Sequence, residues 1–108
     1  MGEESKIETK MKEYAEELGL MFLKFVSPGN RGVPDRIIIG HQSVMAFAEL
    51  KKPKETPNEK QLKMHEKFCQ RGFEVQVIDN LDDGLALLED IARISTELRE
   101  LELGGTLQ

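Results

Sequence analysis

Three charged side chains in one short segment have the types and spacing for metal-dependent chemistry. Asp35 stands near the start of the β-branched segment 33–52, and Glu49 and Lys51 stand near its end. Carboxylate oxygens are the ligands that Mg²⁺ takes in proteins. Such an ion polarises a phosphoryl oxygen and lowers the pKa of a bound water, and a neighbouring lysine stabilises the charge that builds on phosphorus. The set suits metal-assisted chemistry at a phosphoryl group, provided that the three side chains meet.

They meet if residues 34–39 and 44–51 form a β-hairpin. The Gly-His-Gln-Ser loop between the two strands centres near residue 42, so the numbers of cross-strand partners sum to about 84. Asp35 and Glu49 satisfy this sum, which places their Cβ atoms about 5 Å apart. Lys51 projects from the same face as Glu49 because strand side chains alternate. A slip of one residue would separate the groups, and a surface salt bridge of Lys51 with either acid is the alternative interpretation.

The flanking segments bring further candidates to this end of the hairpin. The loop before Asp35 contains Gly29, Gly32 and Pro34, which let a substrate backbone approach closely. Gln61 on the following helix and Glu8 on the first helix reach the same pocket if those helices pack at the sheet end.

The elements that must position these residues alternate between helix and strand. Apolar spacing predicts a first helix over 3–18, closed by Gly19, with Ser5 and Glu8 as a candidate capping box. Thr56 and Pro57 favour the start of a second helix. The predicted strands are 20–26, 34–39, 44–51 and 73–79, and the later helices are 57–71 and 81–103, with fraying expected over 104–108.

This order predicts one α/β domain over residues 1–108, with a core at about 4–80 and a C-terminal helix at 81–103. Its mixed sheet has about four strands flanked by helices. The helix at 57–71 is long enough for a crossover, so the strand at 73–79 can join the sheet in parallel.

Charge is distributed unevenly along the chain. The net charge is −5, and residues 81–108 account for all of it with seven acidic and two basic side chains. Residues 51–71 carry seven basic and three acidic side chains. This basic segment fits a phosphate-backbone partner and fits a solvated helix face equally well.

Cysteine usage and hydropathy limit the location of the protein and its other sites. The single cysteine, Cys69, excludes an internal disulfide and fits a reducing cytoplasm. His65 and Cys69 have the spacing of metal ligands, but the chain has no second pair, so Cys69 is expected in the core. No apolar run approaches about 20 residues, so we expect a cytoplasmic protein, in the host cytoplasm if viral, that does not span a membrane.

The motif residues resemble those of a nuclease superfamily. Pro34-Asp35, a hairpin and then Glu49-Leu50-Lys51 resemble the PD-(D/E)xK core, a pattern that is often met by chance. Over residues 4–80, the segments KFVSPGNRGVPDRIII, FAELKKPKETPNEKQ and GFEVQVID resemble the stand-alone VRR-NUC domain, the virus-type replication–repair nuclease module. This longer match is specific.

The resemblance implies a restriction-endonuclease-like fold and a deoxyribonuclease that uses Mg²⁺ or Mn²⁺. Asp35 and Glu49 correspond to metal ligands, together with the main-chain carbonyl of Leu50. Lys51 corresponds to the catalytic lysine, and Gln61 to a helix glutamine that supports the lysine and the substrate phosphate.

The resemblance also implies an acidic ligand on the first helix and basic contacts to DNA. Glu8 fits the acidic position best, with Glu4 as the alternative. The expected nucleic-acid contacts are Lys24, Arg31, Arg36 and Lys52. Arg31 and Arg36 could equally be simply solvated.

Compact members of this family suggest a homodimer that cuts branched DNA in repair, as Holliday junction resolvases do, because paired nicks suit twofold-related sites. The alternatives are a nuclease that nicks duplex DNA or trims its ends, and a non-catalytic nucleic-acid-binding module of the same fold.

Overall fold

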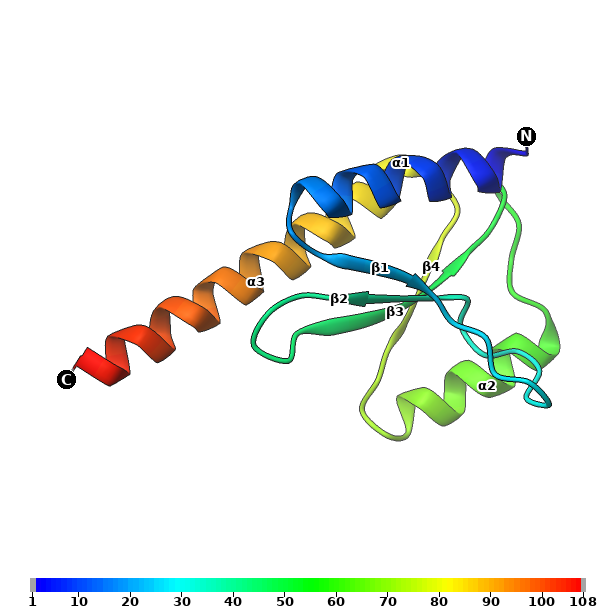
Figure 1. Cartoon of the computed structure of the whole chain (residues 1–108). Coiled ribbons are helices and arrows are strands. Elements are labelled where there is room, and N and C mark those ends of the chain that lie inside the picture. The colour runs from blue at the N-terminus through cyan, green and yellow to red at the C-terminus, as the bar shows by residue number, and fades with distance from the viewer. Residues whose placement is uncertain (1, 108) are drawn as a thin grey trace.

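The computed structural model describes residues 2–107, and the side chains of residues 2–103. In this part of the chain the elements follow the predicted order, which confirms the α/β fold class (Figure 1). They are α1 (Glu3–Glu17), β1 (Met21–Lys24), β2 (Arg36–Ile39), β3 (Met45–Leu50), α2 (Glu59–Cys69), β4 (Val75–Ile78) and α3 (Leu81–Leu107). Among these residues, none of the helices combines the length and apolar character that a membrane span requires.

The four strands form one mixed sheet in the order β1-β2-β3-β4. β1 and β3 both pair antiparallel with β2, and β4 pairs in parallel with β3. The parallel pairing confirms that α2 is a crossover. Helices α1 and α3 lie side by side on one face of the sheet, and α2 covers the other (Figure 1).

The main core lies between the sheet and the α1–α3 pair. Strand residues that alternate toward these helices are buried, among them Ile38, Ala48 and Leu50. They pack with buried helix residues such as Met11 and Leu88.

Two other contacts fix the helices against this core. A Cβ atom at Gly84 of α3 would lie 2.7 Å from the Met11 sulfur of α1, so glycine permits the close approach of the two helices. On the opposite face of the sheet, the Phe47 ring meets Phe68 of α2 and Phe73 edge-on, at centroid distances of 4.8 and 5.6 Å. These ring contacts hold α2 on the sheet.

Two helix starts differ from the predictions. The N-cap of α2 is Asn58 rather than Thr56, because Asn58 and Gln61 form a reciprocal capping box. The N-cap of α1 is Gly2, so Ser5 lies inside the helix and no Ser5–Glu8 capping box forms; Glu8 pairs with Arg36.

The end of the chain also differs, since α3 continues to Leu107 where fraying was expected. That expectation rested on the low helix propensity of two consecutive glycines. Residue 108 lies outside the described residues.

Candidate active site

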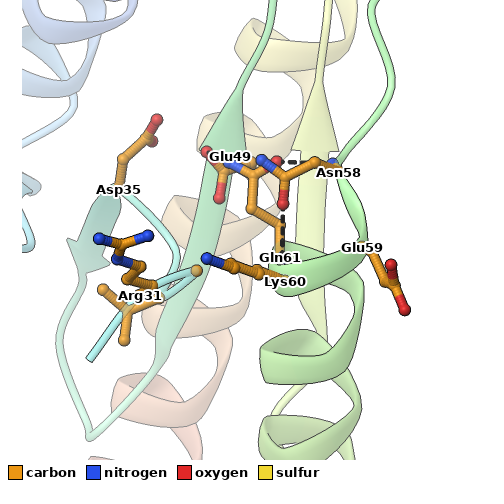
Figure 2. A pocket seen from close by; sticks show the side chains of 9 residues that line it. Arg31, Asp35, Glu49, Asn58, Glu59, Lys60 and Gln61 are labelled. Carbon is orange, nitrogen blue, oxygen red and sulfur yellow. Dashed lines mark hydrogen bonds between the residues drawn. The ribbon is translucent and has the colours of Figure 1, made fainter.

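The hairpin register places Asp35 directly across from Glu49. Arg36 pairs with Ala48 and Ile39 with Met45, so the predicted register is correct and the next positions outward are Asp35 and Glu49. The Leu50 main-chain N–H donates a hydrogen bond of 3.1 Å to Asp35 Oδ1, which fixes the aspartate against β3. Both acids line one cleft (Figure 2).

Glu49 is an unusual carboxyl group because it is only 3% exposed. Burial raises its pKa to about 8, and the charge of Asp35 and a hydrogen bond with Asp35 contribute to the increase. The positive charge of Lys51 acts in the opposite direction but does not offset these effects. The metal-free cleft therefore favours the protonated, neutral form of Glu49.

This donor set fits a hard divalent cation. Glu49 Oε1 is buried and accepts no hydrogen bond from the described residues, and a cation between Asp35 and Glu49 would satisfy it. Within residues 2–103, no three or more His, Cys, Asp or Glu side chains are grouped to hold one metal ion. The remaining positions around Mg²⁺ would therefore fall to water, main-chain and phosphate oxygens, as is common for this ion.

Lys51 follows directly after β3, where its N–H donates to the Ile78 carbonyl at 2.8 Å. Its charge affects both Glu49 and His65, so the Lys51 ammonium group lies in the field of the same cleft. The structure brings Asp35 and Glu49 into one cleft, and the place of the Lys51 ammonium group beside them stays a prediction. Leu50 adjoins both Glu49 and Lys51, and the role of its carbonyl as a ligand stays a prediction.

Gln61 is held between a helix cap and the acidic pair. Its side-chain Oε1 accepts from the Asn58 N–H at 2.9 Å, which completes the capping box. Its Nε2 then donates to Glu49 Oε2 at 3.3 Å (Figure 2). The cap therefore orients the amide toward Glu49, and the support of Lys51 by Gln61 that the family resemblance suggested stays a prediction.

His65 is the residue that sequence reasoning missed. Its Nε2 lies 3.5 Å from Glu49 Oε1, one helical turn beyond Gln61. Burial lowers the pKa of His65, and the charge of Lys51 lowers it further. Because the pKa of Glu49 is raised, this contact joins neutral groups in the metal-free protein. His65 and Cys69 have the spacing of metal ligands, but Cys69 is exposed and not in the core, where it was expected.

The first helix contributes to the site through a buried arginine. Arg36 Nη2 lies 2.6 Å from Glu8 Oε2, and Nη1 donates to the Asp35 main-chain carbonyl at 2.7 Å. The Arg36 side chain is only 8% exposed and is paired with Glu8, which gives it a structural task, and its contact with a DNA phosphate stays an untested prediction. Arg36 projects toward α1 because its neighbour Asp35 projects toward the cleft.

Glu4 and Glu8 of α1 both remain candidate metal ligands. Glu8 is engaged by Arg36, whereas the charge of Glu4 reaches Glu49 and adds to burial and Asp35 in raising its pKa. Which of the two is a ligand stays a prediction.

Two basic residues, Arg31 and Lys60, line the cleft, which has a volume of about 760 Å³. Arg31 was expected near the site, whereas Lys60 was not singled out from the sequence. Figure 2 shows the Lys60 side chain extending toward the side of the cleft where Arg31 lies. Gly32 allows loop and helix to meet here, because its φ is +86° and a Cβ would lie 2.5 Å from the Lys60 carbonyl oxygen.

The other two expected DNA contacts are exposed, and their role stays a prediction. Lys24 pairs across the sheet with Arg36, so it starts from the face opposite to Glu49. Lys52 follows the catalytic candidate Lys51, and its main-chain N–H donates to Glu55 at 3.1 Å.

Comparison with known proteins gives two similar chains. No family model matches. A relative named "Putative nuclease p44", from Acyrthosiphon pisum secondary endosymbiont phage 1, is 38% identical over 79 residues, which cover 73% of this chain and 85% of the relative. A solved structure described as a VRR_NUC domain is 33% identical with a TM-score of 0.75, and the match covers 82% of this chain and 97% of that one.

Proposed function

The chain belongs to the VRR-NUC family of nucleases, and on this basis we propose that it is a DNA endonuclease that depends on Mg²⁺ or Mn²⁺. Its mixed sheet with helices on both faces is the restriction-endonuclease-like fold of that family. The observation that supports metal dependence is the buried Glu49 opposite Asp35, with an Oε1 atom that no donor among residues 2–103 satisfies.

In this proposal each residue of the cleft has a separate task. Asp35 and Glu49 hold the divalent ion, and Gln61 orients the Glu49 carboxylate. When bound, the ion supplies Lewis acidity and lowers the pKa of the attacking water. Lys51 stabilises the negative charge that develops on the scissile phosphate. Burial of Glu49 keeps bulk water away from the inner wall of the site.

The rim of the cleft suits the neighbouring phosphates of a DNA strand. Arg31 and Lys60 line the opening on the loop and helix sides, and Lys52 extends the basic stretch. Long basic side chains bind the phosphate backbone without reading its sequence. Such contacts position a strand over the acidic pair whatever its base sequence.

We further propose that the active form is a homodimer that acts on branched DNA. The supporting observation is an apolar stripe on the second half of α3, where Ile94, Leu98 and Leu101 are 38%, 40% and 72% exposed. This half of α3 extends beyond the sheet (Figure 1). A second copy packed on the stripe would remove apolar surface from water and supply a second cleft for paired nicks.

Cleavage of a labelled four-way junction and of a linear duplex with the same arm sequence tests the proposal. We expect cutting with Mg²⁺ or Mn²⁺, none with EDTA, and faster cutting of the junction. An Asp35→Asn variant that cuts as fast as the wild type would remove the metal-based mechanism. Faster cutting of the linear duplex would favour a nuclease that nicks duplex DNA or trims ends.

A further inference from the structure

Helix α2 presents two polar side chains to a single carboxylate. Gln61 and His65 are four residues apart, so they lie on the same face of the helix. Gln61 Nε2 contacts Glu49 Oε2 at 3.3 Å, and His65 Nε2 lies 3.5 Å from Glu49 Oε1. Each oxygen of Glu49 therefore faces its own nitrogen atom from the same helix.

The contact with His65 is buried on both sides. The side chains of His65 and Glu49 are 13% and 4% exposed. Both facing atoms, Nε2 and Oε1, are inaccessible to solvent and have no hydrogen-bond partner in the part of the chain that the structure describes. Because an N–H···O hydrogen bond is formed at about 2.7–3.2 Å, a movement of roughly 0.5 Å would join them.

A glutamate that binds a metal ion needs this kind of support. The terminal torsion of a glutamate side chain is broad, so a contact at one oxygen leaves the carboxylate free to swing. A second contact at the other oxygen fixes the plane of the group. Each carboxylate oxygen can accept more than one interaction, so both contacts leave room for the ion.

We propose that His65 is a positioning residue that, together with Gln61, fixes the orientation of the Glu49 carboxylate for metal binding. The inference rests on the proposed metal-dependent function. An apolar residue at position 65 would fill the space between α2 and β3 equally well, but it would leave Oε1 facing hydrocarbon, where an unpaired polar atom is costly.

A pair of variants separates this role from simple packing. His65→Gln keeps an N–H donor on a flexible side chain, and His65→Met has a similar length and no donor. His41→Met is the matched control, because His41 is exposed in the hairpin turn far from the cleft. The measurements are Mg²⁺ affinity by calorimetry, kcat and KM on labelled DNA, and thermal unfolding in EDTA.

We expect His65→Met to weaken Mg²⁺ binding by about tenfold or more and to lower kcat with little change in KM for DNA. His65→Gln should recover most of the affinity, and His41→Met should match the wild type. Unfolding in EDTA should be similar for the Met and Gln variants. If His65→Met fails to fold, His65→Phe takes its place as the variant without a donor.

Wild-type affinity and turnover in His65→Met would overturn the inference while leaving the proposed function intact. Equal losses in the Met and Gln variants would also overturn it, because they would show that only the imidazole ring shape matters. A wild-type protein that neither binds Mg²⁺ nor cuts DNA would refute the proposed function, and the inference with it.

Discussion

Asp35 lies opposite Glu49 at the open end of the β2–β3 hairpin, so two carboxyl groups share one end of the sheet. Like charges in this position destabilise a sheet unless a cation or a proton lies between them. The same pair that fits a divalent ion is therefore a source of instability in the metal-free protein, and this has a measurable dependence on pH.

The metal-free protein should lose stability as pH rises from about 4.5 to 8. Burial and the charge of Asp35 raise the pKa of Glu49 from its ordinary 4.5 to about 8, so the folded state favours the protonated form. A raised pKa stabilises the fold fully at pH values below the pKa of the unfolded state. This contribution is lost as the pH rises through the pKa of the folded state. Urea unfolding of the wild type and of Glu49→Gln in EDTA, across this pH range, measures the difference in their free energies of unfolding.

The free energy of unfolding of the wild type should fall relative to that of Glu49→Gln as pH rises. At the high end of the range, Glu49→Gln should be the more stable of the two. Glu74→Gln, at an exposed glutamate, controls for the general effect of removing a carboxyl group and should track the wild type. A wild-type minus Glu49→Gln difference that stays flat between pH 5 and 8 would contradict the account.

Lys51→Ala should separate metal binding from catalysis. We expect kcat to fall by about a hundredfold or more, because the amine stabilises charge that appears in the transition state. Mg²⁺ affinity by calorimetry should not fall, since Lys51 is a cation near the ion and not a ligand. Lys10→Ala, at an exposed lysine of α1 that pairs with Glu13, is the control. Cleavage at the wild-type rate by Lys51→Ala would rule out this role.

Gly32→Ala should damage the cleft more than Gly29→Ala. Both glycines have a positive φ, +86° and +82°, so both substitutions carry similar backbone strain. Only at Gly32 does a Cβ meet other atoms, at 2.5 Å from the Lys60 carbonyl oxygen. The loop with Arg31 must then move away from α2. We expect Gly29→Ala to lose about 1 kcal/mol of stability and Gly32→Ala to lose more, and only Gly32→Ala to lose DNA affinity as well, measured by anisotropy.

The register of the acidic pair could be predicted because it depends on local sequence alone. A four-residue turn fixes which positions face each other, and strand alternation then puts Asp35 and Glu49 on one face. The same alternation places Arg36 on the opposite face, so its burial against α1 could have been inferred. The basic character of Arg36 drew attention to DNA, but its position in the strand was the stronger indication.

The contacts of α2 could not be predicted in the same way. The contact between His65 and Glu49 depends on how the crossover helix rotates on the sheet, which the Phe47–Phe68 packing determines. One indication was available, since the four-residue spacing of Gln61 and His65 puts both on one helix face. Without the register of α2 against β3, nothing showed that this face met Glu49.

Arg36→Met should destabilise the fold by about 3 kcal/mol, because it leaves Glu8 and the Asp35 carbonyl without their buried partner. Adding Glu8→Gln should restore part of the loss, since no unpaired charge then remains. Arg93→Met is the control: Arg93 pairs with Asp90 and Glu97 on the surface of α3, where such pairs contribute less than about 1 kcal/mol. Equal unfolding midpoints for the two arginine variants would show that Arg36 has no special structural role.

The apolar stripe on α3 predicts a dimer that charge can disrupt. Leu98→Lys and Leu101→Lys should convert a dimer to a monomer in light scattering, because each places a charge in an apolar interface. Leu62→Lys is the matched control, since Leu62 of α2 is also exposed, at 55%, but lies outside the stripe. The dissociated variants should still nick one strand of a junction, because Asp35, Glu49 and Lys51 all come from one chain, but they should lose paired cutting. A monomeric wild type at working concentration would exclude the dimer and leave the single-chain cleft as the complete nuclease site.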